Sequence, residues 1–350
     1  MFDIIVVGAG PAGTTFARLA NKNLKILVID KNNNFEKCCG GLIAPDAQKM
    51  LAKFDIGIPK TIISDPQLFY VRAIDLKTNR EQNYQRHYTN INRKLLDRYF
   101  IEKMPTNVEF KSKCRYISHK QHKDFVTVSV IDNDNSKKTE YVCKLLVGAD
   151  GASSLIRKKL YNDFDKIRKY ISIQGEYKLN KPINHFAVFF DKSINNFYSW
   201  LIPKGDHVLI GGAFNPKHKP NSKYRILLKK VKELGYDFES ETKDSEKLNA
   251  CFLIRPGVKD IRTGKGRIVL IGEAAGFISP SSSEGYSYAY KSALALANSI
   301  TDIINFKTKK YKHATNGIYL RILLKNIKGF FMYNSIIRNI IFKFGIGSIK

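Results

Sequence analysis

The sequence lacks the features that mark membrane-spanning, disulfide-linked and metal-binding proteins. No apolar run approaches the roughly 20 residues that a bilayer-spanning helix needs. The five cysteines are an odd number without CxxC or zinc-type spacing, which argues against a disulfide framework and a structural metal. The apolar start has no basic region before it and runs directly into a glycine motif, so we expect a cytoplasmic protein without a signal peptide.

Signatures of other enzyme classes are also missing. No P-loop and no Ser-His-Asp arrangement is evident. His119 and His122 are flanked by lysines with no carboxylate near, so we interpret them as part of a polar surface segment between strands and predict no metal site.

Positive charge is abundant, with a formal net charge of +28. It favours polyanionic partners, or it reflects lysines scattered over a solvated surface. The segment 306–350 differs from the rest because no Asp or Glu follows Asp302, and its cations alternate with Ile, Leu and Phe. We expect helices there, with 318–328 amphipathic enough to lie in an anionic membrane interface; the alternative is terminal helices that cover a sheet with their lysines in water. Specific nucleic-acid binding fits less well, because no recognition motif accompanies the charge.

The first thirty residues predict a βαβ unit. Residues 3–8 and 25–30 have the pattern of buried strands, and 11–21 that of a helix. Between the first strand and the helix lies GxGxxG, in which Gly8 permits a tight turn, Gly10 lets the backbone approach a pyrophosphate and Gly13 lets helix and strand pack closely. The helix N-terminus presents free N–H groups to phosphates, and Asp30 ends the second strand where a carboxylate can hold ribose hydroxyls. These features predict a dinucleotide site at Gly8, Gly10, Pro11, Ala12, Gly13, Asp30 and Lys31.

The middle of the chain predicts a second kind of sheet. The stretches 170–178, 185–191, 197–203 and 207–214 resemble strands without intervening helices, and 61–88 is also extended. Two more buried strands, 145–147 and 267–271, each end in a glycine-bearing turn, and 286–304 has a helical pattern. We therefore predict an α/β (α+β overall) chain in which a Rossmann-type domain (1–60, 89–160 and 262–305) is interrupted by a mostly antiparallel β-sheet substrate domain (61–88 and 161–261), with C-terminal helices over 306–350.

Three motifs in order carry a family resemblance. The turn Gly148-Ala149-Asp150-Gly151, the turn Gly272-Glu273-Ala274-Ala275-Gly276 and the helix start Asn92-Arg93-Lys94-Leu95-Leu96-Asp97 resemble those of the p-hydroxybenzoate-hydroxylase-type FAD-dependent flavoproteins. The resemblance implies bound FAD, with Asp150 and Gly151 near the nucleotide and Gly272 and Glu273 near the ribityl or pyrophosphate. It also implies that Arg93 pairs with a phosphate and adds Gly285 to the cofactor contacts.

Longer strings resemble the geranylgeranyl-reductase-like branch, and most closely CbrA-type proteins, over nearly the full length. They are Cys39–Gln48, Ile167–Tyr170, Tyr198–Pro203 and Ile271–Tyr288. By this resemblance Cys39, Gly40 and Gly41 lie beside the flavin, where the Cys39 thiol either donates a proton or merely packs as a small apolar group. Tyr198, Trp200 and Pro203 belong to the branch's YxWxFP motif, except that Ile202 replaces Phe. Tyr198 and Trp200 share a strand face, and they either line an apolar substrate cavity or pack in the core. Cys38 falls outside the pattern.

The expected function is FAD-dependent reduction of double bonds in an apolar, isoprenoid-type substrate. No second dinucleotide fingerprint is present, so NAD(P)H or a ferredoxin-type donor would visit transiently. The alternatives are a flavin monooxygenase of the same fold, since one scaffold hosts both chemistries, and a non-catalytic flavin-containing membrane-surface module.

Overall fold

The computed structural model describes residues 1–33, 38–239 and 248–349. The chain divides into two compact units, each assembled from three stretches of sequence. Unit 1 comprises Met1–Phe35, Lys94–Arg168 and Ile254–Asn326, and unit 2 comprises Glu36–Arg93, Lys169–Leu253 and Ile327–Lys350.

Unit 1 is built on a sheet of eight strands within the described residues, in the order β15-β16-β9-β1-β2-β6, with β8 paired to β9 and β7 paired to β8. The strands β16, β9, β1, β2 and β6 run parallel. Ile4, Ile5 and Leu27 are fully buried, as expected for parallel strands that are covered on both faces. The bounds are β1 (Phe2–Val7), β2 (Ile26–Ile29), β6 (Val108–Lys111), β7 (Cys114–Gln121), β8 (Val126–Asp132), β9 (Lys138–Gly148), β15 (Gly264–Lys265) and β16 (Ile268–Leu270).

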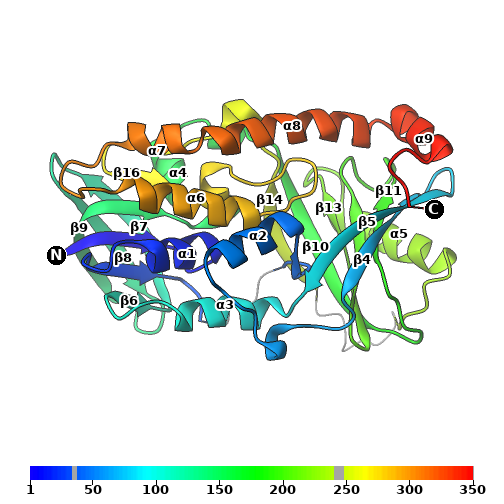
Figure 1. The fold of residues 1–350 in the computed structure, drawn as a ribbon, viewed down its shortest axis with the longest axis horizontal. Helices are drawn as coiled ribbons and strands as arrows, with labels where there is room; N and C mark the ends of the chain where they lie inside the picture. The colour runs from blue at the N-terminus through cyan, green and yellow to red at the C-terminus, as the bar shows by residue number, and fades with distance from the viewer. Residues whose placement is uncertain (34–37, 240–247, 350) are drawn as a thin grey trace. The chain divides into compact units, whose positions relative to one another are not determined.

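Helices cover this sheet, and α1 packs along α6 (Figure 1). The buried side of α1 includes Phe16 and Ala17, and Tyr311 of α7 donates a hydrogen bond from its hydroxyl to the Leu270 carbonyl at 3.0 Å. The helices are α1 (Pro11–Leu19), α3 (Arg93–Glu102), α4 (Leu155–Leu160), α6 (Tyr286–Ser299) and α7 (Thr308–Ala314), with short 3₁₀ turns η2 (Gly151–Ser153), η3 (Phe164–Lys166), η4 (Val258–Asp260) and η5 (Gly272–Ala275).

Unit 2 is built on a second sheet, with eight strands in the part of the chain that the structure describes, in the order β14-β10-β13-β12-β11-β4-β5-β3. Every pair for which the register is defined is antiparallel except β11 with β4. Tyr224, Leu227 and Val231 of α5 pack on this sheet in one apolar core. The bounds are β3 (Leu42–Ile43), β4 (Leu68–Asp75), β5 (Arg80–Asn90), β10 (Lys169–Lys178), β11 (Phe186–Phe190), β12 (Ser199–Lys204), β13 (His207–Phe214), β14 (Asn249–Ile254), α2 (Pro45–Lys53), α5 (Pro220–Glu233) and η1 (Lys60–Ile62).

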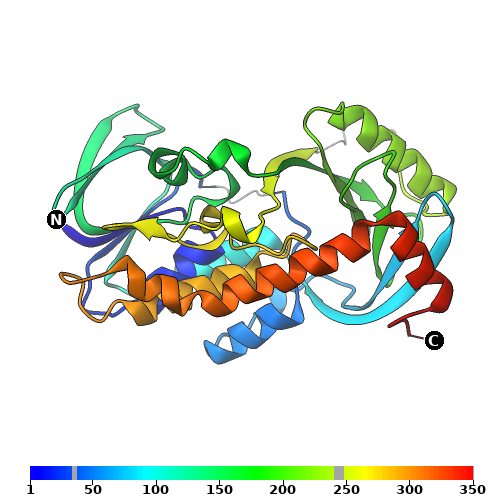
Figure 2. The same ribbon diagram turned by 90° about the horizontal axis from the view of Figure 1, so that it is seen from above.

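The chain ends in two helices, α8 (Asn316–Tyr333) and α9 (Ser335–Phe344), as Figure 2 shows. Residues of α8 up to Asn326 belong to unit 1, and its remaining residues belong with α9 to unit 2. No helix within the described residues is long and apolar enough to cross a membrane.

The predicted α/β class is confirmed, but several predicted boundaries are wrong. Residues 36–60, predicted with the nucleotide domain, belong to unit 2, and 306–350 are divided between the units. The predicted helix 286–304 ends at Ser299, because the Asp302 carboxylate accepts the backbone N–H of Ile304 at 2.8 Å and forms a turn that competes with helix. His119, predicted between strands, lies within β7.

Candidate cofactor and substrate sites

The first glycine motif forms the turn between β1 and α1. Gly8 has φ +108°, and a Cβ there would lie 2.4 Å from the Ala149 carbonyl oxygen. A Cβ on Gly13 would lie 1.9 Å from the Gly8 carbonyl oxygen, so both positions exclude any side chain. Gly10 is the extended N-cap of α1 and Pro11 opens the helix. The first-turn N–H groups of α1 therefore begin at a turn in which Gly8, Gly10 and Gly13 carry no side chain, which is the geometry of an anion site.

Asp30 lies at the end of β2 and holds this turn in place. Its Oδ2 accepts the Ala9 backbone N–H at 2.8 Å, and its Oδ1 accepts the Asn32 N–H at 2.9 Å. Each oxygen has a further lone pair, so the carboxylate can still accept a ribose hydroxyl. Lys31 is exposed, and its carbonyl accepts the Asn133 side-chain amide at 2.9 Å.

The second turn follows β9. Asp150 Oδ2 accepts the backbone N–H of Leu155 at 2.8 Å and of Ile156 at 3.4 Å, which caps α4. The buried Oδ1 has no hydrogen-bond partner among the described residues. Burial raises the pKa of this carboxyl group. Gly151 has φ +75° and open space where a Cβ would point, so the backbone of the turn is open to a ligand there.

The third turn follows β16 and lies against the first. Gly272 has φ +56°, and a Cβ there would lie 2.7 Å from the Ala12 Cβ of α1. The Gly272 N–H donates to Ser292 Oγ of α6 at 2.9 Å. Because Gly8 touches Ala149 and Gly272 touches Ala12, the three predicted turns meet at the carboxyl ends of β1, β9 and β16, where open α/β sheets bind ligands.

The remaining predicted cofactor contacts lie at helix starts. Glu273 is half-buried in the first turn of η5, and Gly285 is the N-cap of α6 with open space where a Cβ would point. Arg93 is the first residue of α3 and the last residue of a unit 2 segment.

Arg157 was not predicted from the sequence, yet it supports the third turn. It is fully buried on α4, and its guanidinium donates to the carbonyl oxygens of Asp260 and, at 3.4 Å, Ala274. Burial lowers the pKa of Arg157 to about 10. Its neighbours in the sequence are also basic, so no local pattern distinguished it.

Unit 2 brings the Cys39-Gly40-Gly41 string onto the strand that carries Trp200 and Pro203. A Cβ on Gly40 would lie 2.3 Å from Ile202 Cδ1, so the side chain that replaces the motif's Phe packs directly on this glycine. Gly41 has φ +60°, and a Cβ there would meet the Ile91 carbonyl oxygen at 2.3 Å and Lys204 Nζ at 2.9 Å. Cys39 itself is half-buried in this loop.

Lys204 is a second residue that sequence reasoning missed. Its Nζ donates to the carbonyl oxygens of Gly41 at 3.3 Å and Ile91 at 2.8 Å, and to Asn90 Oδ1. Burial lowers the pKa of Lys204 to about 8, an effect that Cys39 and Glu176 oppose. The ammonium group therefore fixes the glycine loop to the end of β12.

Tyr198 and Trp200 lie side by side with ring centroids 5.7 Å apart. Both are half-buried, and Trp200 Nε1 donates to Gln174 Oε1 on β10 at 2.9 Å. Burial raises the pKa of Tyr198 strongly, and the neighbouring Tyr88 and Cys39 add to this. Pro203 is buried in β12 and its carbonyl accepts the Asn90 side-chain amide at 2.8 Å, so it supports the sheet.

Cys38 has neighbours that the sequence did not reveal. Its Sγ lies 3.4 Å from Ser172 Oγ, and the Cys251 thiol donates to the Cys38 carbonyl at 3.5 Å. A hydrogen bond between the side chains of Cys251 and Cys38 lowers the pKa of the Cys38 thiol, and burial of the thiol opposes this.

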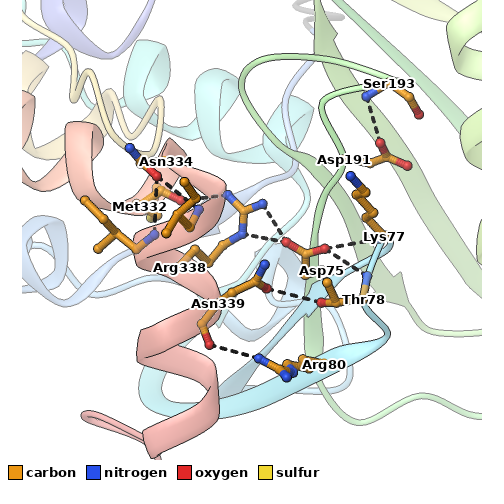
Figure 3. Close-up of polar contacts among 12 residues, drawn as sticks. Asp75, Lys77, Thr78, Arg80, Asp191, Ser193, Met332, Asn334, Arg338 and Asn339 are labelled. Carbon is orange, nitrogen blue, oxygen red and sulfur yellow. Dashed lines mark hydrogen bonds and ion pairs between the residues drawn. The ribbon is translucent and has the colours of Figure 1, made fainter.

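A cavity of roughly 340 Å³ lies in unit 2, away from all the predicted site residues. Its two carboxylates are paired with cations of the chain, Asp75 with Arg338 and Asp191 with Lys230 (Figure 3 shows the first pair). Both carboxylates therefore already have a cation of the chain as partner, and we do not assign the cavity a ligand. It is lined by Asp75, Lys77, Asp191, Lys192, Ser193, Lys230, Ser335, Arg338 and Asn339.

This fold, with three glycine turns meeting at the strand ends, defines a flavoprotein of the FAD-binding class. Residues 1–315 match the model of the FAD binding domain family, and the chain belongs to that family. It is 35% identical to protein CbrA from Escherichia coli strain K12, over 99% of this chain and 98% of that protein. The family recognised from the sequence is therefore confirmed.

Two solved structures share the fold. A geranylgeranyl bacteriochlorophyll reductase-like protein from Thermoplasma acidophilum is similar with a TM-score of 0.80 and 17% identity, covering 96% of this chain and 87% of that one. Klebsiella pneumoniae HpxO, in a complex with FAD and uric acid, is similar with a TM-score of 0.70 and 16% identity. The match covers 98% of this chain and 92% of HpxO. At these identities the likeness shows the fold alone.

The residues of unit 1 fit FAD. The glycine-rich turn at Gly8–Gly13 and the N-terminus of α1 suit a pyrophosphate. The free lone pairs of Asp30 and the unpartnered Asp150 Oδ1 suit hydroxyl groups of the nucleotide.

Proposed function

We propose that this protein reduces carbon–carbon double bonds of an apolar, isoprenoid-type substrate. The proposal rests above all on the Cys39-Gly40-Gly41 loop, whose glycines pack on Ile202 and Lys204 of β12, the strand that carries most of the Tyr198–Pro203 string. In the family resemblance these two strings together distinguish the reductase branch. The likeness to a geranylgeranyl bacteriochlorophyll reductase-like protein supports the fold that such a reaction needs.

The chain's own residues would bind FAD, orient the substrate and deliver a proton to it. Gly8–Gly13, Asp30, Asp150 and the turn at Gly272 would hold FAD, which supplies a hydride when it is bound and reduced. A double bond that gains a hydride must also gain a proton, and the half-buried Cys39 thiol or a water would deliver it. The aromatic faces of Tyr198 and Trp200 would contact the apolar chain of the substrate and exclude water. NAD(P)H or a ferredoxin-type donor would supply the electrons between turnovers.

The test is a single turnover with the FAD-loaded protein. The protein is reduced without oxygen and mixed with a polyprenyl diphosphate, and the product mass is measured. We expect a product heavier by two hydrogens. A product formed only with oxygen and heavier by one oxygen atom would instead identify a monooxygenase, and no product under either condition would favour the non-catalytic module.

Variants of Cys39 test the proton delivery separately. Cys39→Ser should keep FAD content and lower the rate of product formation by about tenfold or more, since general acids contribute roughly 10²–10⁴-fold. Cys143→Ser, in the buried core of unit 1, is the matched control. Full turnover in Cys39→Ser would leave water as the donor.

A further inference from the structure

Exposed large apolar side chains are concentrated in the C-terminal segment of the chain. Within the described residues, eleven of the twenty exposed large apolar side chains lie between residues 320 and 349. Phe330 is 66% exposed, Ile336 71% and Phe344 69%. We call the whole set the C-terminal strip: Leu320, Leu323, Leu324, Ile327, Phe330, Phe331, Ile336, Ile340, Phe344, Ile346 and Ile349.

On α8 the strip occupies one face of the helix. At roughly 100° per residue, its members from Leu320 to Phe331 fall within an arc of about 120°. The opposite face carries Ile318 and Ile322, which are buried. The helix is thus apolar on two faces, and only one of them is used within the protein.

The exposed face of α9 is fixed by a buried ion pair on its other face (Figure 3). Arg338 donates to Asp75 Oδ2 at the end of β4 from Nη2 at 2.6 Å and from Nε at 3.0 Å, and both side chains are buried. Thr78 and Arg80 bond to Asn339, at 3.2 and 3.4 Å. A rotation that hid Ile336 would expose the charges of Arg338 and Asp75, so the apolar face is held outward.

The segment that carries the strip, 320–349, contains charges of one sign only. No Asp or Glu occurs after Asp302, and Arg321, Lys328 and Lys343 are exposed beside the apolar residues. Two copies of this surface facing each other would bring like charges together, which disfavours self-association. An anionic bilayer complements both features, because its acyl boundary accepts Ile, Leu and Phe while its phosphates attract Lys and Arg.

We propose that the C-terminal strip docks this protein onto an anionic lipid surface, with α8 and α9 lying in the plane of the interface. The side chains of the strip insert at the acyl boundary, and Arg321, Lys328 and Lys343 contact headgroup phosphates. This docking does not depend on the reaction proposed above. It would also serve that reaction by bringing the enzyme to a membrane-dissolved substrate.

The test is sedimentation of the full-length protein with vesicles of phosphatidylcholine containing about one third phosphatidylglycerol. The variant Phe330→Ser/Ile336→Ser/Phe344→Ser should partition about tenfold or more weakly, because it removes the most exposed apolar groups of the strip. The matched control is Phe69→Ser/Phe252→Ser/Ile304→Ser, which removes the same residue types at exposures of 62%, 55% and 62% elsewhere. Wild-type protein should also bind about tenfold less to pure phosphatidylcholine.

Each other outcome overturns the proposal. Equal partition of the strip variant and the wild type would exclude the strip, and equal binding to neutral vesicles would exclude the role of charge. Absence of vesicle binding, together with a dimer that only the strip variant abolishes, would identify an interface between two copies. Thermal unfolding and flavin content of both triple variants should match the wild type, since all six positions are exposed.

Discussion

Burial changes the proton affinity of individual side chains, and His185 shows the effect most directly. Its pKa is lowered to about 4, first by burial and then by Arg72. The ring is bonded to the Tyr236 hydroxyl at 2.9 Å and stacks on Tyr70. Between pH 6.5 and 4 the unfolded chain therefore binds a proton that the folded chain does not, so this site lowers the stability as the pH falls through that window.

His185→Gln should remove this dependence. We expect the loss of unfolding free energy between pH 7 and about pH 4.5 to be smaller by about 2 kcal/mol than in the wild type. Urea unfolding at the two pH values measures it. His218→Gln, at an exposed position, is the control for the substitution itself. Equal pH dependence of His185→Gln and wild type would mean that the ring is protonated in the folded protein.

The residues that sequence reasoning missed are those whose role comes from distant partners. Arg157 bonds to carbonyl oxygens more than a hundred residues away, and Lys204 to a loop formed by Gly41 and Ile91. Their types and neighbours in the sequence carry no signal of burial. Gly8 and Gly13 were predictable because the chemistry of a tight turn leaves only glycine.

At the scale of an element, the start of α6 offers a clean test of the cofactor site. Gly13→Ala cannot separate binding from folding, because its Cβ would lie 1.9 Å from a backbone oxygen. At Gly285 nothing in the protein lies within 4 Å of the position of a Cβ, and the residue is the N-cap of the helix. Ala should therefore cost less than about 1 kcal/mol of stability there.

If FAD occupies that space, Gly285→Ala should weaken FAD binding about tenfold or more while thermal unfolding of the apoprotein stays within a few degrees of the wild type. Fluorescence titration of the apoprotein with FAD measures the affinity. Gly57→Ala is matched, because its Cβ also meets open space. Unchanged FAD affinity in Gly285→Ala would remove Gly285 from the cofactor contacts.

The elements that the sequence predicts best are those with short-range signals. The strands of unit 2 from β10 to β13 lie within one or two residues of the predicted ranges, because alternation and turns define them locally. The end of α6 was predicted five residues too late, because the turn that follows the helix is formed by the side chain of Asp302 and is not marked by Gly or Pro. The hairpin β7–β8 and helix α5 were not predicted; the polar face of β7 hides its strand pattern.

At the scale of the whole molecule, the two units carry different parts of the predicted sites. The three glycine turns and Asp30 lie in unit 1. The Cys39 loop and the Tyr198–Pro203 string lie in unit 2. Motif order predicts different domains for the glycine turns and the Tyr198–Pro203 string, but it does not predict the transfer of 36–60, and with it the Cys39 loop, to unit 2. That segment joins unit 2 through pairing of β3 with β5 at Leu42–Asn90, a contact between residues far apart in the sequence.

The division predicts how the whole protein responds to flavins. A ligand that binds only the folded state at a hundred times its dissociation constant adds about 2.7 kcal/mol, which for a chain of 350 residues raises the midpoint of thermal unfolding by about 4 °C. We expect FAD to give this shift to the apoprotein. FMN lacks the adenosine monophosphate part of FAD and offers the Gly8–Gly13 turn one phosphate in place of a pyrophosphate, so at the same concentration it should give less than about 1 °C. An FMN shift equal to that of FAD would mean that the flavin end provides the binding energy and that the glycine turns of unit 1 do not anchor the cofactor.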